Sequence, residues 1–408
     1  MKIKRIILIV ALLAFGLSAT AQTMKVQSAY ADMKANRLAQ AMENINDACI
    51  NENTKADPKT WHYAGLIYAK LVEISQSEKS EDQKLWKKQK VETSIPELAE
   101  KAKIAFLKSN ELEKTTNTNE YTTLNNGTLN FIVRYQLSNA LNVFNSGKYA
   151  ESIPMFEDIV ITSKTIGKNA SDVEMKARFC IAMAYDVTKQ KDKAVEMYRE
   201  LINDNTQEES VYINLFIANT QAKEMDKAIN VLKRGVKNLP TNYKLLGLLS
   251  GAYIEAGKKE EADKCIGILK NMADTITTNK QVVIVMVGDA LRDGGNKDEA
   301  IAMYNKSLAL QPEQTEANFG LGVLYFNSAV DMKEKADKLP LDQTTEYDKL
   351  QAESKAQFAL SIPFFEKVLT MKPKDIKTLN ALKVIYSRLE MTDKYKQVSA
   401  TLESLRSK

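Results

Sequence analysis

The chain has 408 residues, with 57 Lys and Arg, 52 Asp and Glu and a formal net charge of +5, a balance that provides no basic footprint for nucleic acid. Its single His and three Cys exclude a site built on paired histidines, a framework of several disulfides and a four-cysteine zinc site. With only 15 Gly and 8 Pro, a turn-rich β-sandwich or β-barrel is excluded as well.

The segment 1–21 has the pattern of a secretory signal peptide. A basic start (KIKR) is followed by an apolar run over 6–16 and by the small-x-small sequence ATA at 19–21, which predicts cleavage before Gln22. The alternative is an uncleaved N-terminal anchor, although the run is shorter than the roughly 20 apolar residues of a spanning helix. After cleavage we expect no membrane-spanning segment. We predict an exported protein that is periplasmic, with outer-membrane association and an extracellular location as alternatives.

From residue 24 onward, a helical pattern recurs at regular intervals. Ala194, Ala228 and Ala262 follow one another at equal spacing, in the segments KDKAVEMYRELI, MDKAINVLKRGV and EEADKCIGIL. A fourth copy, KDEAIAMYNKSLALQP around Ala300, comes after a slightly longer interval. A second apolar segment precedes each copy. Such a period, about 34 residues, indicates stacked helical hairpins, in which neighbouring repeats supply each other's missing core.

These repeats resemble the tetratricopeptide repeat (TPR), whose pattern is W-x2-L-G-x2-Y, then A-x3-F, then P. In the copy near residue 61, Trp61, Gly65 and Tyr68 match, and Ala102 and Phe106 match after an insertion. The matches in later copies are Gly147, Tyr149 and Phe156; Tyr185, Ala194 and Tyr198; Leu215, Ala228 and Pro240; Leu249, Tyr253, Gly257 and Ala262; Gly288, Gly295, Ala300, Tyr304 and Pro312; Leu321, Gly322, Tyr325, Phe365 and Pro373. The resemblance implies an all-α TPR α-solenoid, a right-handed superhelix of about eight helix-turn-helix repeats over 24–408.

Two insertions interrupt the array, near 72–98 and near 331–358. The Gly and Ala positions of a regular copy lie close together, as Gly288 and Ala300 do, but the corresponding Gly65 and Ala102 are about three times as far apart. Spaced apolar residues predict that each insertion lengthens both helices of its pair into a projecting hairpin, so that the array has two extended helical-hairpin insertions. The alternative is a solvated disordered loop, because both tips are polar (SQSEKSED and LDQTTEY).

Two prolines stand where a helix is expected. Pro154 and Pro363 both occur in an SIPxFE sequence, within the second helix of their repeats. We interpret both as residues of the first helical turn, where proline lacks only an amide hydrogen that would have no intrahelical partner.

The sequence contains little that points to catalysis. His62, the only histidine, follows Trp61 in the first helix of its repeat, so we interpret it as a packed residue. Neither a phosphate-binding G-x-x-x-x-G-K-[ST] loop nor a G-x-S-x-G nucleophile motif occurs. We therefore predict a protein that is not an enzyme, with no catalytic residue, no cofactor and no metal site.

The resemblance implies a groove, because the first helices of TPR arrays line a concave face. By this analogy the groove contacts are apolar: Leu137, Leu141, Phe144, Phe179, Met183, Ile213 and Ile217. The TPR carboxylate clamp uses Lys, Arg and Asn at such positions, so an acidic chaperone C-terminus is not the expected ligand. An amphipathic helix or an extended peptide with bulky side chains fits these residues. The alternative is that the chain's own helices fill the groove.

We therefore predict an exported, non-catalytic scaffold of TPR type that binds peptide or protein partners in the cell envelope, and no nucleic acid. The alternative function is an outer-membrane-associated accessory protein for glycan handling or envelope assembly. Two observations argue against glycan handling. Trp61 and Trp86 are the only tryptophans, and Gln22 occupies the position at which a lipid-anchored protein has Cys.

Overall fold

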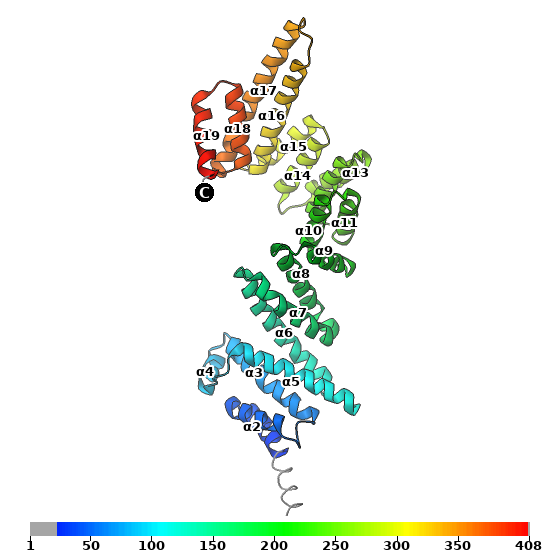
Figure 1. Cartoon of the computed structure of the whole chain (residues 1–408), viewed down its shortest axis with the longest axis vertical. Coiled ribbons are helices and arrows are strands. Elements are labelled where there is room, and N and C mark those ends of the chain that lie inside the picture. Colours follow the sequence, from blue (N-terminus) through cyan, green and yellow to red (C-terminus); the bar gives the residue numbers. More distant parts are fainter. Residues whose placement is uncertain (1–22, 407–408) are drawn as a thin grey trace, which may run out of the picture. The chain divides into compact units, whose positions relative to one another are not determined.

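The computed structural model describes residues 23–406, so the predicted signal peptide lies outside the described residues. The described chain consists of helices joined by short turns, and no β-strand occurs within it (Figure 1). This confirms the predicted all-α fold. None of the helices in this range is both long enough and apolar enough to cross a membrane.

The helices divide into two compact units, with the boundary between Thr206 and Gln207. Unit 1 begins with the helical segment 23–34 and continues with α2 (Leu38–Ile50), α3 (Pro58–Gln76), α4 (Ser80–Gln89), α5 (Ile95–Thr116), α6 (Thr122–Asn145), α7 (Tyr149–Ile166), the short 3₁₀ helix η1 (Gly167–Ala170), α8 (Ser171–Val187) and α9 (Lys191–Asn203). Unit 2 contains α10 (Glu209–Gln221), α11 (Met225–Asn238), α12 (Tyr243–Glu255), α13 (Lys259–Thr275), α14 (Lys280–Asp293), α15 (Lys297–Leu310), α16 (Thr315–Asp337), α17 (Thr344–Met371), α18 (Ile376–Arg388) and α19 (Thr392–Arg406).

Within each unit the helices pack as a series of hairpins. The pairs are α3 with α5, α6 with α7 and α8 with α9 in unit 1, and α10 with α11, α12 with α13, α14 with α15, α16 with α17 and α18 with α19 in unit 2. The first helix of each pair also contacts the first helix of the next pair, so that α3, α6 and α8 form one row and α10, α12, α14, α16 and α18 form another. We call the surface along each row the first-helix face of that unit.

Close packing within a hairpin depends on small residues opposite aromatic rings. A Cβ atom on Gly65 of α3 would lie 2.4 Å from Cε1 of Phe106 on α5, and Phe106 is fully buried. Gly322 of α16 has the same relation to Phe365 of α17, with a closest approach of 2.8 Å. In both hairpins a small residue on one helix thus makes room for a large ring on the other.

In several hairpins the turn between the two helices contains one residue in the left-handed backbone conformation. Lys189, Lys223 and Gly257 have φ angles of 64°, 61° and 70° and hold the same place in three successive hairpins. Gly147 and Gly295 hold this place in two others, with φ angles of 84° and 85°. Positive φ is strained for a residue with a Cβ atom, yet Lys189 and Lys223 adopt it. The turn conformation is therefore the same in these hairpins even where the sequence has no glycine.

The first insertion differs from the lengthened hairpin that we expected. A separate short helix, α4, lies between α3 and α5 and packs against α3. Gln89 at its end is buried; its Nε2 donates to the carbonyl oxygen of Asn36 and its Oε1 accepts from the backbone N of Ala39, both at 3.2 Å. These hydrogen bonds satisfy the polar groups at the start of α2, which is a reason for this segment to fold back.

The second insertion is built into α16 and α17, which are 23 and 28 residues long and pack against each other. The turn at 338–343 connects them, and Leu341 in that turn is 99% exposed.

The predicted placement of the two prolines in a first helical turn is wrong. Pro154 follows the first turn of α7, and Pro363 lies deep inside α17, because the insertion extends that helix far upstream. Both helices continue through the proline. In each SIPxFE sequence the serine hydroxyl donates to a carbonyl one turn earlier: Ser152 to Tyr149 at 2.8 Å and Ser361 to Phe358 at 2.6 Å. Such a bond favours the slight bend that a proline ring requires inside a helix.

Candidate functional site

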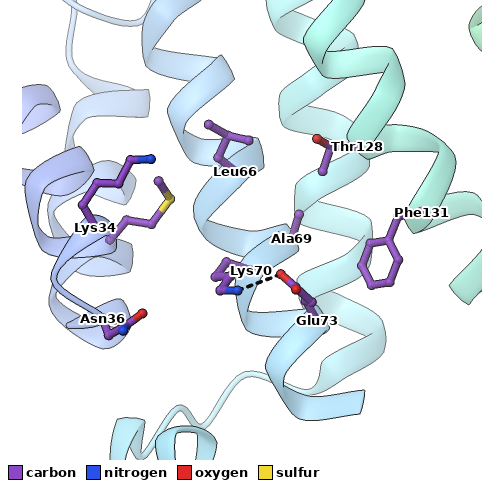
Figure 2. A pocket seen from close by; sticks show the side chains of 9 residues that line it. Lys34, Asn36, Leu66, Ala69, Lys70, Glu73, Thr128 and Phe131 are labelled. Atoms are coloured by element: carbon purple, nitrogen blue, oxygen red, sulfur yellow. Dashed lines mark hydrogen bonds and ion pairs between the residues drawn. The ribbon is translucent and has the colours of Figure 1, made fainter. Parts of the chain in front are cut away.

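A pocket of about 720 Å³ opens on the first-helix face of unit 1 (Figure 2). Segment 23–34, α3 and α6 form its walls, and the turn after segment 23–34 adds Asn36. Its lining residues are Met33, Lys34, Asn36, Leu66, Ala69, Lys70, Glu73, Thr128 and Phe131. Because segment 23–34 and two successive first helices, α3 and α6, all contribute, the packing of separate elements creates this pocket and no single hairpin contains it.

The pocket has an apolar lining that other helices leave uncovered. Met33 and Leu66 are half-buried, and Phe131 of α6 is 38% exposed. Leu124, two turns before Phe131 on the same helix, is 60% exposed. Exposed apolar side chains gathered at a concave site are typical of a binding surface.

Paired tyrosines and lysines continue the same face beside the pocket. The rings of Tyr30 and Tyr63 stack with centroids 4.3 Å apart and planes 13° apart, which joins segment 23–34 to α3. The Nζ atom of Lys34 lies 5.3 Å from the Tyr30 ring centroid, and that of Lys59 lies 5.7 Å from the Tyr63 centroid. At these distances each ammonium group forms a cation–π interaction with its ring, which orients the group without neutralising its charge.

A buried polar network lies behind this face and fixes α3, α5 and α6 to one another. The side chains of His62 and Asn125 are hydrogen-bonded at 2.7 Å between Nδ1 and Oδ1, and Asn125 donates to Asn110 at 2.8 Å. The His62 ring also stacks on Tyr121, with centroids 4.5 Å apart. Burial lowers the pKa of His62, although the hydrogen bond with Asn125 and nearby carboxylates oppose this change. The interpretation of His62 as a packed residue is confirmed.

A single carboxylate organises the beginning of α6. Glu113 of α5 accepts hydrogen bonds from the backbone N of Glu120 at 2.5 Å and from those of Tyr121 and Thr122 at 2.8 Å, and also from the Thr122 hydroxyl at 2.6 Å. Burial favours the neutral acid, but these hydrogen bonds outweigh it and lower the pKa of Glu113. The carboxylate thereby satisfies amide groups that the helix itself leaves unpaired.

Unit 2 has a smaller pocket of about 310 Å³ on its own first-helix face, between α14, α16, α17 and α18. Its charged groups are mostly paired with one another. Arg292 contacts Asp289 at 2.8 Å, and Lys372 contacts Glu316 at 3.2 Å. The hydroxyl of Tyr304 also donates to Asp289 at 2.7 Å. This pocket is therefore close to electrostatic balance.

The structure places the predicted groove residues in both units. Leu137, Leu141 and Phe144 on α6 are half-buried and pack against the core of unit 1, and the Phe144 ring contacts Tyr149 and Phe156 of α7. Phe179 on α8 is only 6% exposed, and Met183 is half-buried. Ile213 and Ile217 lie on α10 of unit 2, with Ile217 43% exposed. Partner contact by these residues stays a prediction.

The pocket residues of unit 1 were absent from that prediction. Segment 23–34 lies outside the copies that match the repeat pattern, so that pattern does not predict its contribution to the face. One signal was present, because Tyr30 and Tyr63 are separated by almost one repeat period and thus occupy nearly equivalent positions.

Comparison with known proteins identifies the repeat. Residues 288–328 match the family model for a TPR repeat. Similar solved structures include a TPR protein from Parabacteroides merdae ATCC 43184, at 14% identity over 65% of this chain and 98% of that one with a TM-score of 0.38. They also include MamA, at 21% identity over 48% of this chain and 98% of that one with a TM-score of 0.31. YrrB, described as a TPR protein with an unusual peptide-binding site, has 12% identity over 45% of this chain and 88% of that one, with a TM-score of 0.33. No curated protein matches the chain.

The matched residues cover the end of α14, all of α15 and the first part of α16, which belong to a first helix, a second helix and the next first helix. The hairpins before and after them repeat the same helix pairing. With a match to the TPR family model at residues 288–328 and the same helix pairing in the other hairpins, the chain is an array of helical hairpins that is similar to TPR repeats.

Proposed function

We propose that this protein is an exported, non-catalytic scaffold of TPR type whose first-helix face in unit 1 binds a peptide or protein segment of a partner in the cell envelope. TPR arrays present extended surfaces to partners, and their stability comes from repeat packing and not from a ligand. The observation that carries the proposal is the pocket of about 720 Å³, which is bordered by apolar side chains that the described chain leaves exposed.

The chemistry of the face supports binding more than catalysis. The only histidine is buried and hydrogen-bonded to Asn125, so it offers no accessible base. Within residues 23–406, His, Cys, Asp and Glu side chains nowhere gather in a group of three that could hold a metal ion.

The alternative of glycan handling has no specific support on this face. Sugar platforms need free aromatic ring faces, but the rings of Tyr30 and Tyr63 stack on each other and carry lysines beside them. Trp61 is half-buried and donates from Nε1 to the carbonyl oxygen of Lys55 at 2.7 Å.

The export part of the proposal is supported by the sequence of segment 1–21. Expression of the full-length chain in a Gram-negative host, followed by fractionation and N-terminal sequencing, tests it directly. The expected product is periplasmic and begins at Gln22. A cytoplasmic product that retains segment 1–21 would refute export.

Site-specific photo-cross-linking tests which surface meets a partner. A photoreactive amino acid replaces one of three residues: Phe131 on the first-helix face, Ile104 on α5, or Leu341 at the tip of the α16–α17 hairpin. Ile104 is 51% exposed and serves as the matched control on a second helix. We expect a covalent adduct with a partner protein in living cells at position 131 and none at 104. Adducts at 341 alone would show that the hairpin is the contact surface and would overturn the proposal.

A further inference from the structure

Two lysines on the first-helix face of unit 1, Lys34 and Lys59, lack acidic partners of their own among the described residues. Within the described residues, Lys34 and Lys59 contact tyrosine rings and form no ion pair with a carboxylate. An ammonium group has three N–H donors, and an aromatic face satisfies none of them as fully as an oxygen does. Both groups therefore keep donors available for a ligand.

The carboxylates in the neighbourhood are already engaged. Glu73 in the pocket wall pairs with Lys70 at 3.0 Å, as Figure 2 shows. Asp32 bonds to Arg37 at 2.6 Å, and Asp57 accepts a hydrogen bond from the backbone N of Lys59 at the start of α3. Among the residues named here, four basic groups, those of Lys34, Arg37, Lys59 and Lys70, stand against three carboxylates, so a small excess of positive charge remains around the pocket.

The apolar and the basic groups lie next to each other on the same two elements. Lys34 and Met33 both line the pocket, and Lys59, Tyr63, Leu66 and Lys70 follow one another along α3 at the spacing of one helical turn. From Lys59 to Lys70 this row is about 16 Å long, at about 1.5 Å per residue. A peptide of about five extended residues spans that length.

We propose that the partner of this pocket is an acidic segment that carries a bulky apolar side chain. The proposal rests on the proposed function and adds the chemistry of the ligand. The apolar side chain enters the pocket between Leu66 and Phe131, and side-chain carboxylates beside it pair with Lys34 and Lys59. Charge complementarity selects the partner, and burial of the apolar side chain holds it.

Selection from a library of random peptides displayed on phage tests the proposal with the purified protein from the full-length chain. The expected result is enrichment of peptides with Asp or Glu within a few residues of Phe, Leu, Ile or Trp. We expect the selected peptides to bind the double variant K34E/K59E about tenfold more weakly or worse, because each pair is lost and replaced by repulsion. Phe131→Ala should weaken binding by about tenfold or more through loss of apolar burial.

The matched control is K87E/K88E, which makes the same charge change on two exposed lysines of α4 that do not line the pocket. It should bind the selected peptides as the wild type does, and circular dichroism should show equal helix content in all variants. Binding should also be unchanged when synthetic peptides carry an amidated C-terminus, because side-chain carboxylates make the contact.

Three outcomes contradict the proposal in distinguishable ways. Enrichment of basic or uncharged peptides that depend on Phe131 would overturn the ligand chemistry and leave peptide binding intact. Equal weakening by K87E/K88E would show that only overall charge matters. Absence of any enriched peptide would refute peptide binding itself, and the ligand chemistry with it.

Discussion

Replacement of Gly65 by Ala tests the packing that defines the hairpin. A Cβ atom at this position would lie 2.4, 2.5 and 2.8 Å from the Cε1, Cδ1 and Cγ atoms of Phe106. Because Phe106 is fully buried, its ring has no free volume into which it can turn. The two helices must separate slightly, or the ring must leave its preferred rotamer.

Two opposing contributions set the magnitude. Overpacking of a tight core typically costs about 1–3 kcal/mol. Alanine, however, favours a helix interior over glycine by about 1 kcal/mol. We therefore expect Gly65→Ala to lower the free energy of unfolding by about 0–2 kcal/mol. Gly127→Ala is the matched control, because Gly127 is an exposed residue of α6 with no atom within 4 Å of a new Cβ. It should gain up to about 1 kcal/mol, so the difference between the variants isolates the overpacking.

Urea denaturation followed by tryptophan fluorescence measures this difference. Both tryptophans, Trp61 and Trp86, belong to unit 1, so the signal reports on the unit that contains both glycines. A companion Phe106→Leu substitution should remove most of the penalty of Gly65→Ala, although it lowers the stability of the parent. Equal stabilisation by Gly65→Ala and Gly127→Ala would refute the packing described for this hairpin.

Three further substitutions test other parts of the fold. Gly257→Ala should destabilise unit 2 by about 1 kcal/mol through backbone strain alone, since φ is 70° and no atom lies within 4 Å of a new Cβ. Urea denaturation followed by circular dichroism measures this change, and an unchanged midpoint would contradict it. Glu113→Gln should cost about 1–3 kcal/mol in the tryptophan assay, because three amides and a hydroxyl lose their charged acceptor; wild-type stability would show that the cap is dispensable. Burial lowers the pKa of His62, so the unfolded chain binds a proton more readily than the folded one, and the free energy of unfolding should fall as pH drops from about 6.5 toward the folded-state pKa. His62→Gln should remove this pH dependence, whereas Glu113 affects the pH dependence of stability only below about pH 4.5.

The repeat architecture was predictable because its determinants are local and recur. Gly65 and Phe106, although separated by an insertion, belong to the pattern that also places Gly322 against Phe365. Each pair recurs because every hairpin must bring two backbones close together around a large side chain. The same physical requirement acting in successive hairpins made the pattern visible in a single sequence.

The parts that sequence reasoning missed depend on contacts between distant segments. Helix α4 is fixed by Gln89, whose side chain reaches back to Asn36 and Ala39 at the start of the array, and a polar contact of this kind leaves no periodic signal. Pro363 was misplaced because the start of α17 depends on how far the insertion extends the helix, which the SIPxFE sequence does not encode.

The binding surface is harder to predict from the sequence than the fold is, because its residues need not recur from one repeat to the next. Packing positions must be alike in every repeat, but the outward positions of the first helices are free to differ. In unit 2 the outward positions of α14 include Asp289 and Arg292, which form an ion pair with each other. Glu316 on α16 pairs with Lys372, so opposite charges neutralise each other within the pocket. In unit 1, Lys34 has no carboxylate partner among the described residues. An acidic ligand would have to displace existing ion pairs to enter the pocket of unit 2, whereas in unit 1 it adds pairs at no such cost, so the two faces of one chain favour different partners.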